Sequence, residues 1–211
     1  MRVTRVKPVA RPPGFVAIEV DGARLAVLPV EKARALRLEV GCALDDTLLR
    51  EVERAGAAER AYLAAVRLLA ARGRASQEVL RRLRQKGFPP DAVAEAVGRL
   101  EVAGVLDDTR YAESFAAARA ERGFGRTRIL ADLASRGVDR RVAERAVDRL
   151  EASGERDAAA EIDRLVRNRI GRMRGLPRPV VERRLVAFLV RRGFGGADGL
   201  RAVRAVLRED I

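Results

Sequence analysis

The chain has 211 residues, of which 48% are hydrophobic, enough to form one large or two small folded domains. This composition excludes a disordered polymer. Aromatic residues make up only 4% and tryptophan is absent, so Ala, Val and Leu must form most of the core and favour closely packed helices. Lys and Arg number 43 against 30 Asp and Glu, and the formal charge of +13 indicates an acidic or polyanionic partner.

Several function classes have no support in the sequence. No apolar run reaches the roughly 18 residues of a membrane helix, and the N-terminus lacks the apolar stretch of a signal peptide. We therefore expect a cytoplasmic protein that has no membrane partner. Cys42 is the single cysteine, expected as a small buried hydrophobe, and histidine is absent, so common zinc sites and the usual general base cannot form. A Gly-Lys-Ser/Thr phosphate loop is also absent, and we expect no enzyme, no cofactor and no metal.

In chain order, the first predicted element is a β-hairpin. Apolar and polar residues partly alternate from Phe15 to Leu28, and Asp21-Gly22 lies at the centre, where a type I′ turn favours these residues. The strands are expected at residues 15–20 and 24–28. A hairpin of this size is not stable alone, so it should pack on another element.

Two helices are expected after the hairpin. The first should cover about residues 29–38 and stop near Gly41. Asp45 or Asp46 should cap the second, which is predicted to run to about Ala55.

From Ala58 onward only helix signals remain, and one unit occurs three times. Gly87 recurs 50 residues later as Gly137, and after a further 56 residues as Gly193. Other positions that recur at the first offset are Arg72-Gly73, Leu80, Leu83, Val97, Arg99-Leu100-Glu101 and Gly104. In each copy, three apolar stripes at helical spacing are separated by glycines, which predicts a three-helix repeat.

These patterns predict a mainly α protein in which tandem three-helix repeats form an elongated curved array behind a small β-hairpin and short helices. The expected divisions are an N-terminal region over 1–57 and repeats over 58–106, 107–154 and 155–211. The third copy should have a longer first helix that carries Ile162, Val166, Ile170 and Met173, with a break at residues 175–177.

Two pairs of adjacent carboxylates could in principle hold a divalent cation. Asp107-Asp108 and Asp45-Asp46 each precede an apolar helical run. Aspartates in this position usually cap the helix and interact with its dipole, so we interpret both pairs as N-caps.

The basic clusters are the candidate contact sites. Between Arg164 and Arg192 there are ten arginines and one carboxylate, Glu182. Helical spacing turns these arginines away from the apolar stripes, and a smaller cluster lies on the second helix of the first repeat. The predicted partner or DNA contacts are Arg81, Arg82, Arg84, Lys86, Arg164, Arg167, Arg172, Arg174, Arg183, Arg184 and Arg191. The alternative is that these are ordinary solvated faces, although such faces usually mix charges. Arginine suits phosphates and carboxylates equally.

Three stretches resemble a known family: LLAARGRAS at 68–76, LRQKGF at 83–88 and GVLDDTRYA at 104–112. Gly123, Arg128-Ile129, Leu133 and Arg136-Gly137-Val138 continue the match, which covers Ala61 to about Leu150. The chain resembles the bacterial RecX regulatory family. The resemblance implies tandem three-helix repeats, no chemistry of its own, and binding along the groove of the RecA recombinase filament. It also implies inhibition of ATP hydrolysis, strand exchange and coprotease activity.

Three hypotheses remain open. The first is a regulator of the RecA filament on single-stranded DNA, whose arginines contact acidic protein, DNA phosphates or both. The second is a stand-alone basic helical module that binds DNA, including double-stranded DNA, without recombinase regulation. The third is a scaffold or enzyme accessory built on an α-solenoid. A monomer is the default expectation.

Overall fold

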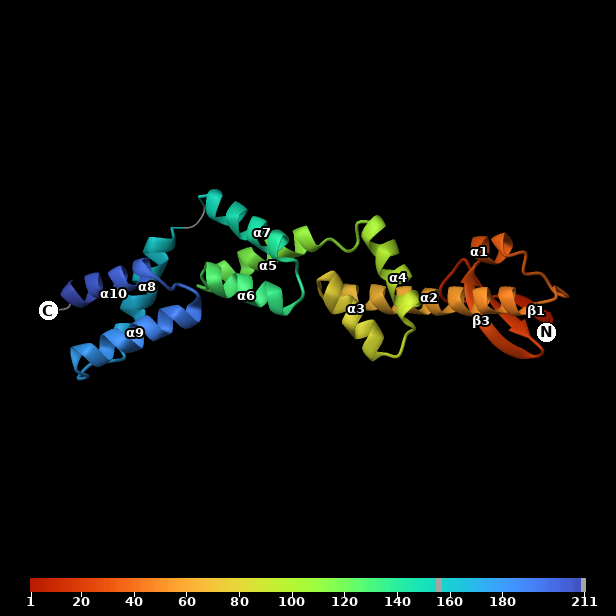
Figure 1. Ribbon diagram of the computed structural model, residues 1–211, viewed down its shortest axis with the longest axis horizontal. Coiled ribbons are helices and arrows are strands. Elements are labelled where there is room, and N and C mark those ends of the chain that lie inside the picture. The colour runs from red at the N-terminus through yellow and green to blue at the C-terminus, as the bar shows by residue number, and fades with distance from the viewer. Residues whose placement is uncertain (155–156, 210–211) are drawn as a thin grey trace. The chain divides into compact units, whose positions relative to one another are not determined.

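The computed structural model describes residues 1–154 and 157–209. The chain divides into two compact units, Met1–Leu106 and Asp107–Ile211. Within the described residues, the first unit holds a small sheet and helices α1 to α4, and the second holds α5 to α10 (Figure 1).

The N-terminal sheet has three antiparallel strands in the order β1-β2-β3. The expected hairpin is confirmed as β2 (Phe15–Val20) and β3 (Ala23–Pro29), joined by Asp21 and Gly22 at φ values of 47° and 83°. The strand β1 (Val3–Pro8) was not predicted. Only its first residue is buried, so its sequence lacks the alternation that identifies a half-buried strand.

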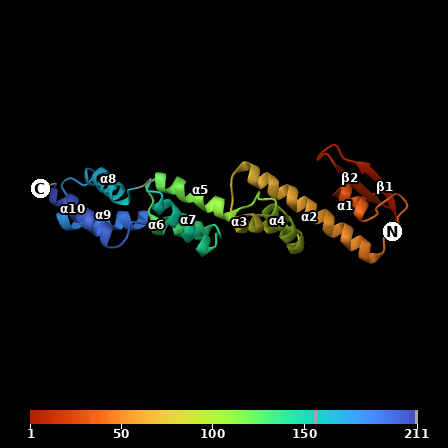
Figure 2. The same cartoon turned by 90° about the horizontal axis from the view of Figure 1, so that it is seen from above.

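The expected end of the second helix near Ala55 is wrong. After the short α1 (Val30–Ala35), α2 (Asp46–Ala71) runs without a break for 26 residues. It continues across residues 57 and 58, where the sequence suggested a division between the N-terminal region and the first repeat. Gly56 lies buried inside this helix and does not mark its end. A Cβ at this position would lie 2.9 Å from the Ala26 Cβ, so the glycine lets α2 pack closely on β3. Figure 2 shows α2 passing from the sheet to α3 and α4.

The first repeat consists of the second half of α2 with α3 (Ser76–Gln85) and α4 (Pro90–Val102). Val79 and Leu83 of α3 meet Val93 and Leu100 of α4 in a continuous buried cluster. The predicted apolar stripes of α3 and α4 therefore form the core of this repeat. Of the stripe expected on α2, Tyr62 and Leu69 pack against the core, but Val66 is exposed.

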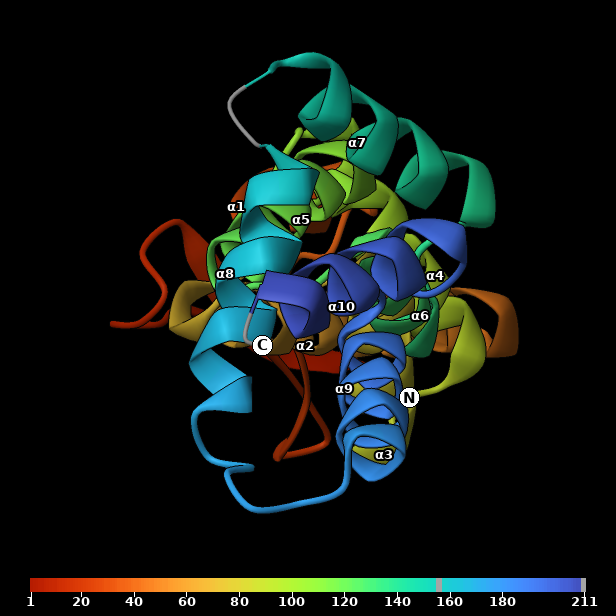
Figure 3. The same ribbon diagram turned by 90° about the vertical axis from the view of Figure 1, so that its left-hand side faces the viewer.

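The second repeat consists of α5 (Asp108–Glu121), α6 (Arg126–Ser135) and α7 (Arg140–Ala152). The third consists of α8 (Ala158–Ile170), α9 (Arg178–Arg192) and α10 (Ala197–Glu209), which pack around one apolar cluster. Figure 3 shows the loop between α8 and α9. The expected start of the third repeat at residue 155 lies outside the described residues.

The prediction of a longer first helix in the third repeat is wrong. Helix α8 has 13 residues, one fewer than α5, and ends at Ile170. Gly171 follows as its cap, and the Met173 N–H donates to the Ile170 carbonyl in a tight turn. Met173 keeps its predicted apolar contact, but from the loop.

The repeated glycines and the aspartate caps act as predicted. Gly87, Gly137 and Gly193 follow the second helix of each repeat at φ values of 82°, 81° and 87°, which glycine adopts most readily. The side chains of Asp45 and Asp107 accept backbone N–H groups at the starts of α2 and α5. None of the helices in the described part combines the length and apolar character that a membrane crossing needs.

Candidate functional site: arginine-rich surfaces

Every predicted contact residue is exposed. They lie on and just after α3, and on α8, the α8–α9 loop and α9: Arg81, Arg82, Arg84, Lys86, Arg164, Arg167, Arg172, Arg174, Arg183, Arg184 and Arg191. Their exposure agrees with the helical spacing, because the opposite, apolar faces of α3 and α9 are buried in the cores of their repeats. Exposure alone does not define a site, so the ion pairs of each repeat decide which positive charges remain available.

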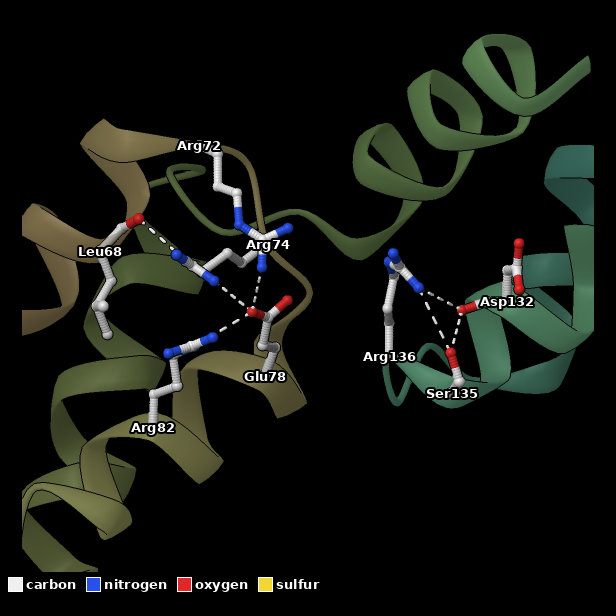
Figure 4. Close-up of polar contacts among 8 residues, drawn as sticks. All are labelled: Leu68, Arg72, Arg74, Glu78, Arg82, Asp132, Ser135 and Arg136. Atoms are coloured by element: carbon white, nitrogen blue, oxygen red, sulfur yellow. Dashed lines mark hydrogen bonds and ion pairs between the residues drawn. The ribbon is translucent and has the colours of Figure 1, made fainter. Parts of the chain in front are cut away.

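In the first repeat, one buried carboxylate binds several arginines. Glu78 of α3 is paired with Arg72 at 2.7 Å, with Arg82 at 3.3 Å and with Arg74 (Figure 4). Arg74 also donates to the Leu68 carbonyl and ties the cluster to α2. Arg82, although exposed, therefore takes part in a structural cluster.

The electrostatics of this cluster favour a charged Glu78. Burial by itself raises the pKa of Glu78, but the hydrogen bond from Arg82 and the charges and hydrogen bonds of Arg72 and Arg74 outweigh it. The pKa of Glu78 consequently lies below its ordinary value. Arg81, Arg84 and Lys86 have no ion-pair partner among the residues that the structure describes, so they carry the available charge of this surface.

The second repeat contains the same type of pair with its charges exchanged. Positions 78 and 82 correspond to Arg128 and Asp132, which pair at 3.1 Å on α6. Asp132 is buried and also binds Arg119 of α5. Arg136 donates to the Asp132 carbonyl and to Ser135 (Figure 4). A buried acid with arginines around it thus holds the second helix in both repeats.

The third repeat lacks this acid. Its corresponding positions are Arg184 and Phe188 on α9, so Arg184 has no carboxylate one turn away at position 188. No ion pair is recorded between described residues for five of the predicted contacts in this repeat: Arg172, Arg174, Arg183, Arg184 and Arg191. The surface formed by these five arginines is called the α9 surface below.

Two predicted contacts of the third repeat are less available. Arg164 pairs with Glu161 at 2.7 Å and Arg167 with Asp163 at 2.7 Å. The sequence count of ten arginines against one carboxylate began at residue 164, immediately after these acids, and therefore overstated the local charge. The hydrogen bond and charge of Glu161 also raise the pKa of Arg164 above its ordinary value.

Arg192 is internal. Its guanidinium donates to the carbonyls of Arg122 and Gly123, and its Cζ lies 5.1 Å and 5.3 Å from the ring centres of Phe124 and Phe188. Gly125 donates its N–H to the Arg192 carbonyl at 2.7 Å. This contact joins the α5–α6 loop to the end of α9, so the second and third repeats dock through Arg192.

Several phenylalanine rings of the second unit, Asp107–Ile211, lie against arginine guanidinium groups. Arg119 lies over Phe124 at 4.3 Å, and Arg136 lies over Phe115 at 4.5 Å. Such cation–π contacts fix the guanidinium planes and occupy ring faces that would otherwise be able to stack on bases. The surface is therefore suited to electrostatic binding.

A hollow of about 400 Å³ lies on the third repeat, next to a larger one of about 580 Å³ that shares Met173 and is lined by Arg174. Its lining residues come from α9 and from the end of α8 with the loop that follows: Arg169, Arg172, Met173, Arg184, Ala187 and Arg191. Arg169 was counted in the basic segment but was not predicted as a contact. The sequence signal that could have identified Arg169 was its spacing of three residues from Arg172, which places the two side chains on the same side near a helix end.

The fold and these surfaces define a class: tandem three-helix repeat proteins whose first two repeats are held by buried acid–arginine clusters and whose third repeat exposes unpaired arginines. Models of the first and second three-helix domains of RecX match residues 61–100 and 107–147. The chain belongs to the RecX family of regulatory proteins.

Curated relatives carry this family name. "Regulatory protein RecX" of Amycolatopsis mediterranei is 34% identical over 143 residues, which cover 67% of this chain and 80% of the relative. The protein of the same name from Pseudomonas syringae pv. tomato is 37% identical over 147 residues, covering 64% and 91%.

Solved structures share the fold. A crystal structure of regulatory protein RecX superposes with a TM-score of 0.79 at 18% identity, covering 97% of this chain and 98% of that one. RecX from Lactobacillus salivarius gives a TM-score of 0.60 at 21% identity, covering 72% and 97%.

Proposed function

We propose that this chain is a non-catalytic, cytoplasmic regulator that binds the RecA filament on single-stranded DNA. It binds along the filament groove, as a monomer, and inhibits ATP hydrolysis, strand exchange and coprotease activity. Membership of the RecX family carries the regulatory role.

The distribution of charge supports a polyanionic partner. The acid–arginine clusters of the first two repeats use their charges internally, whereas the α9 surface keeps five arginines without a described ion pair. Guanidinium groups bind both carboxylates and phosphates through paired N–H donors. The α9 surface therefore suits the acidic protein surface of a filament, its DNA phosphates, or both.

Inhibition would follow from binding energy alone. Several linked repeats can engage neighbouring subunits, and each bound repeat raises the effective concentration of the next. A protein that binds one filament state better than another shifts the population toward that state. Bridging would thus restrict the motions that hydrolysis and strand exchange need. An isolated repeat that inhibited as well as the whole chain at equal concentration would rule bridging out.

The test is the ATPase rate of RecA on single-stranded DNA across a titration of the protein. The test variant is Arg183→Glu/Arg184→Glu/Arg191→Glu on α9. The control is Arg140→Glu/Arg141→Glu/Arg145→Glu on the exposed face of α7, which changes the net charge by the same amount. We expect the parent and the control to inhibit, and the α9 variant to need at least about tenfold more protein, equivalent to about 1.4 kcal/mol.

Unchanged RecA turnover with the parent protein would sink the proposal. Equal losses in the two triple variants would show that inhibition depends on total charge, and the α9 surface would lose its role. Thermal unfolding of each variant excludes misfolding as the cause.

The unpaired arginines also favour a second candidate, a stand-alone DNA-binding module. It predicts affinity for duplex DNA without any protein, and that affinity should fall by about 0.9 log unit per log unit of salt for each phosphate contacted. Absence of duplex binding at low salt would reject it.

A further inference from the structure

The hollow formed by α8, its following loop and α9 has the composition of an anion site. Arg184, Ala187 and Arg191 are spaced three and four residues apart, which puts them on one face of α9. Arg169 and Arg172 face them from the end of α8 and the loop. The volume of about 400 Å³ lies in the range of small-ligand sites. Four guanidinium groups thus surround one space.

The positive charge in this hollow is not neutralised by the described residues around it. None of the six lining residues is a carboxylate. Three described carboxylates of the repeat have other partners, since Glu161, Asp163 and Glu182 pair with Arg164, Arg167 and Arg204. Like charges around a concave surface focus a positive potential and attract an anion.

Arg169 is held in place by packing against α9. Its Cζ lies 5.3 Å from the ring centre of Phe188, and its Nε is buried without a hydrogen-bond partner among the residues described. The Nε is covered by protein atoms, so the terminal nitrogens of the guanidinium are the donors that Arg169 offers to the hollow.

We propose that this hollow binds a phosphate group. A phosphate presents several oxygens in a tetrahedral arrangement and can accept from several guanidinium forks at once, whereas a carboxylate has only two oxygens. The group can come from a nucleic-acid backbone or from free phosphate or pyrophosphate. The inference deepens the proposed function by naming the chemistry of one contact, but it does not require a recombinase.

Adjacent arginines provide a matched control. Arg172 and Arg184 line the hollow, whereas their neighbours Arg174 and Arg183 do not. All four are exposed, so replacing them should leave the core intact. The test variant is Arg172→Gln/Arg184→Gln and the control is Arg174→Gln/Arg183→Gln, each with two fewer positive charges.

Two probes separate the sources of the phosphate. Anisotropy measures binding of a labelled single-stranded oligonucleotide to the full chain at several salt concentrations, and calorimetry measures binding of inorganic pyrophosphate. If the hollow holds a backbone phosphate, the test variant should lose about tenfold more oligonucleotide affinity than the control. Its salt slope should also fall by about 0.7, the value for one phosphate of a single strand.

If the hollow takes free phosphate, pyrophosphate binding should disappear in the test variant alone, while the two variants bind the oligonucleotide equally. Equal losses in both variants with both probes, or no parent binding of either probe, would overturn the proposal. Neither probe involves RecA. The binding measurements therefore test the phosphate site separately from the proposed inhibition of the RecA ATPase.

Discussion

The buried cluster around Glu78 allows a direct test of how the first repeat is held together. Replacing Glu78 with Gln keeps the side-chain shape but removes the charge that binds Arg72, Arg74 and Arg82. We expect a clear loss of stability, because the arginines would keep their charges without the carboxylate.

The structure sets the size of this loss. Arg74 is the least exposed of the three arginines, at 9% side-chain exposure, and a hydrogen bond to a charged group in that setting contributes about 2 kcal/mol. Arg72 and Arg82 are 52% and 44% exposed, so each contributes about 0.5 kcal/mol after solvent screening. Glu78→Gln should therefore lower the free energy of unfolding by about 3 kcal/mol.

Urea unfolding followed by circular dichroism measures the effect. The control is Glu95→Gln, which breaks the exposed pair of Glu95 with Arg54 and should cost less than about 1 kcal/mol. Equal small losses in the two variants would refute the reasoning that burial gives the Glu78 cluster its strength.

The pH dependence gives a second readout of the same cluster. The folded pKa of Glu78 lies below its ordinary value of 4.5, so its contribution is complete above that pH and is lost as pH falls through the folded pKa. The difference in stability between the parent and Glu78→Gln should be constant near neutral pH and shrink below about pH 4.5. A difference that grew with acidity would contradict the sign.

Three further predictions concern the other repeats and α4. Asp132→Asn should destabilise the second unit by about 2 to 3 kcal/mol in urea unfolding, because it leaves buried arginine contacts without their acid. Gly125→Ala should loosen the docking of the second and third repeats, since a Cβ there would collide with the Gly193 carbonyl. Amide hydrogen exchange at this contact should become faster. The control Gly171→Ala, where no atom lies near the Cβ position, should leave the exchange rate unchanged. Gly98→Ala should raise stability by about 1 kcal/mol, because the site is helical and nothing lies near its Cβ position; an unchanged melting temperature would contradict this.

Periodicity predicted the helical repeats well because it reflects which face of each helix is buried. Leu83, Leu133 and Leu189 are almost completely buried, as their stripes required. The hairpin turn followed from Asp21-Gly22, whose backbone preference is local. The strand β1 did not follow, since its place in the sheet depends on pairing with β2 and not on a pattern of its own.

The basic surface was predicted only in part. All the candidate arginines are exposed, but the sequence did not separate Arg164 and Arg167, which bind carboxylates of their own helix, from Arg172 and Arg184. It also missed the hollow, because Arg169 and Arg184 are brought together by the docking of α8 and α9.

The sequence by itself determined the repeat, the glycine and aspartate caps, the family and the excess of positive charge, because each depends on residue type and spacing along one segment. Tertiary structure alone decided that Gly56 lies inside a continuous helix, that Arg192 joins two repeats, and which arginines are neutralised. These outcomes depend on distances between side chains of different elements. Such distances are set only when the apolar faces pack together.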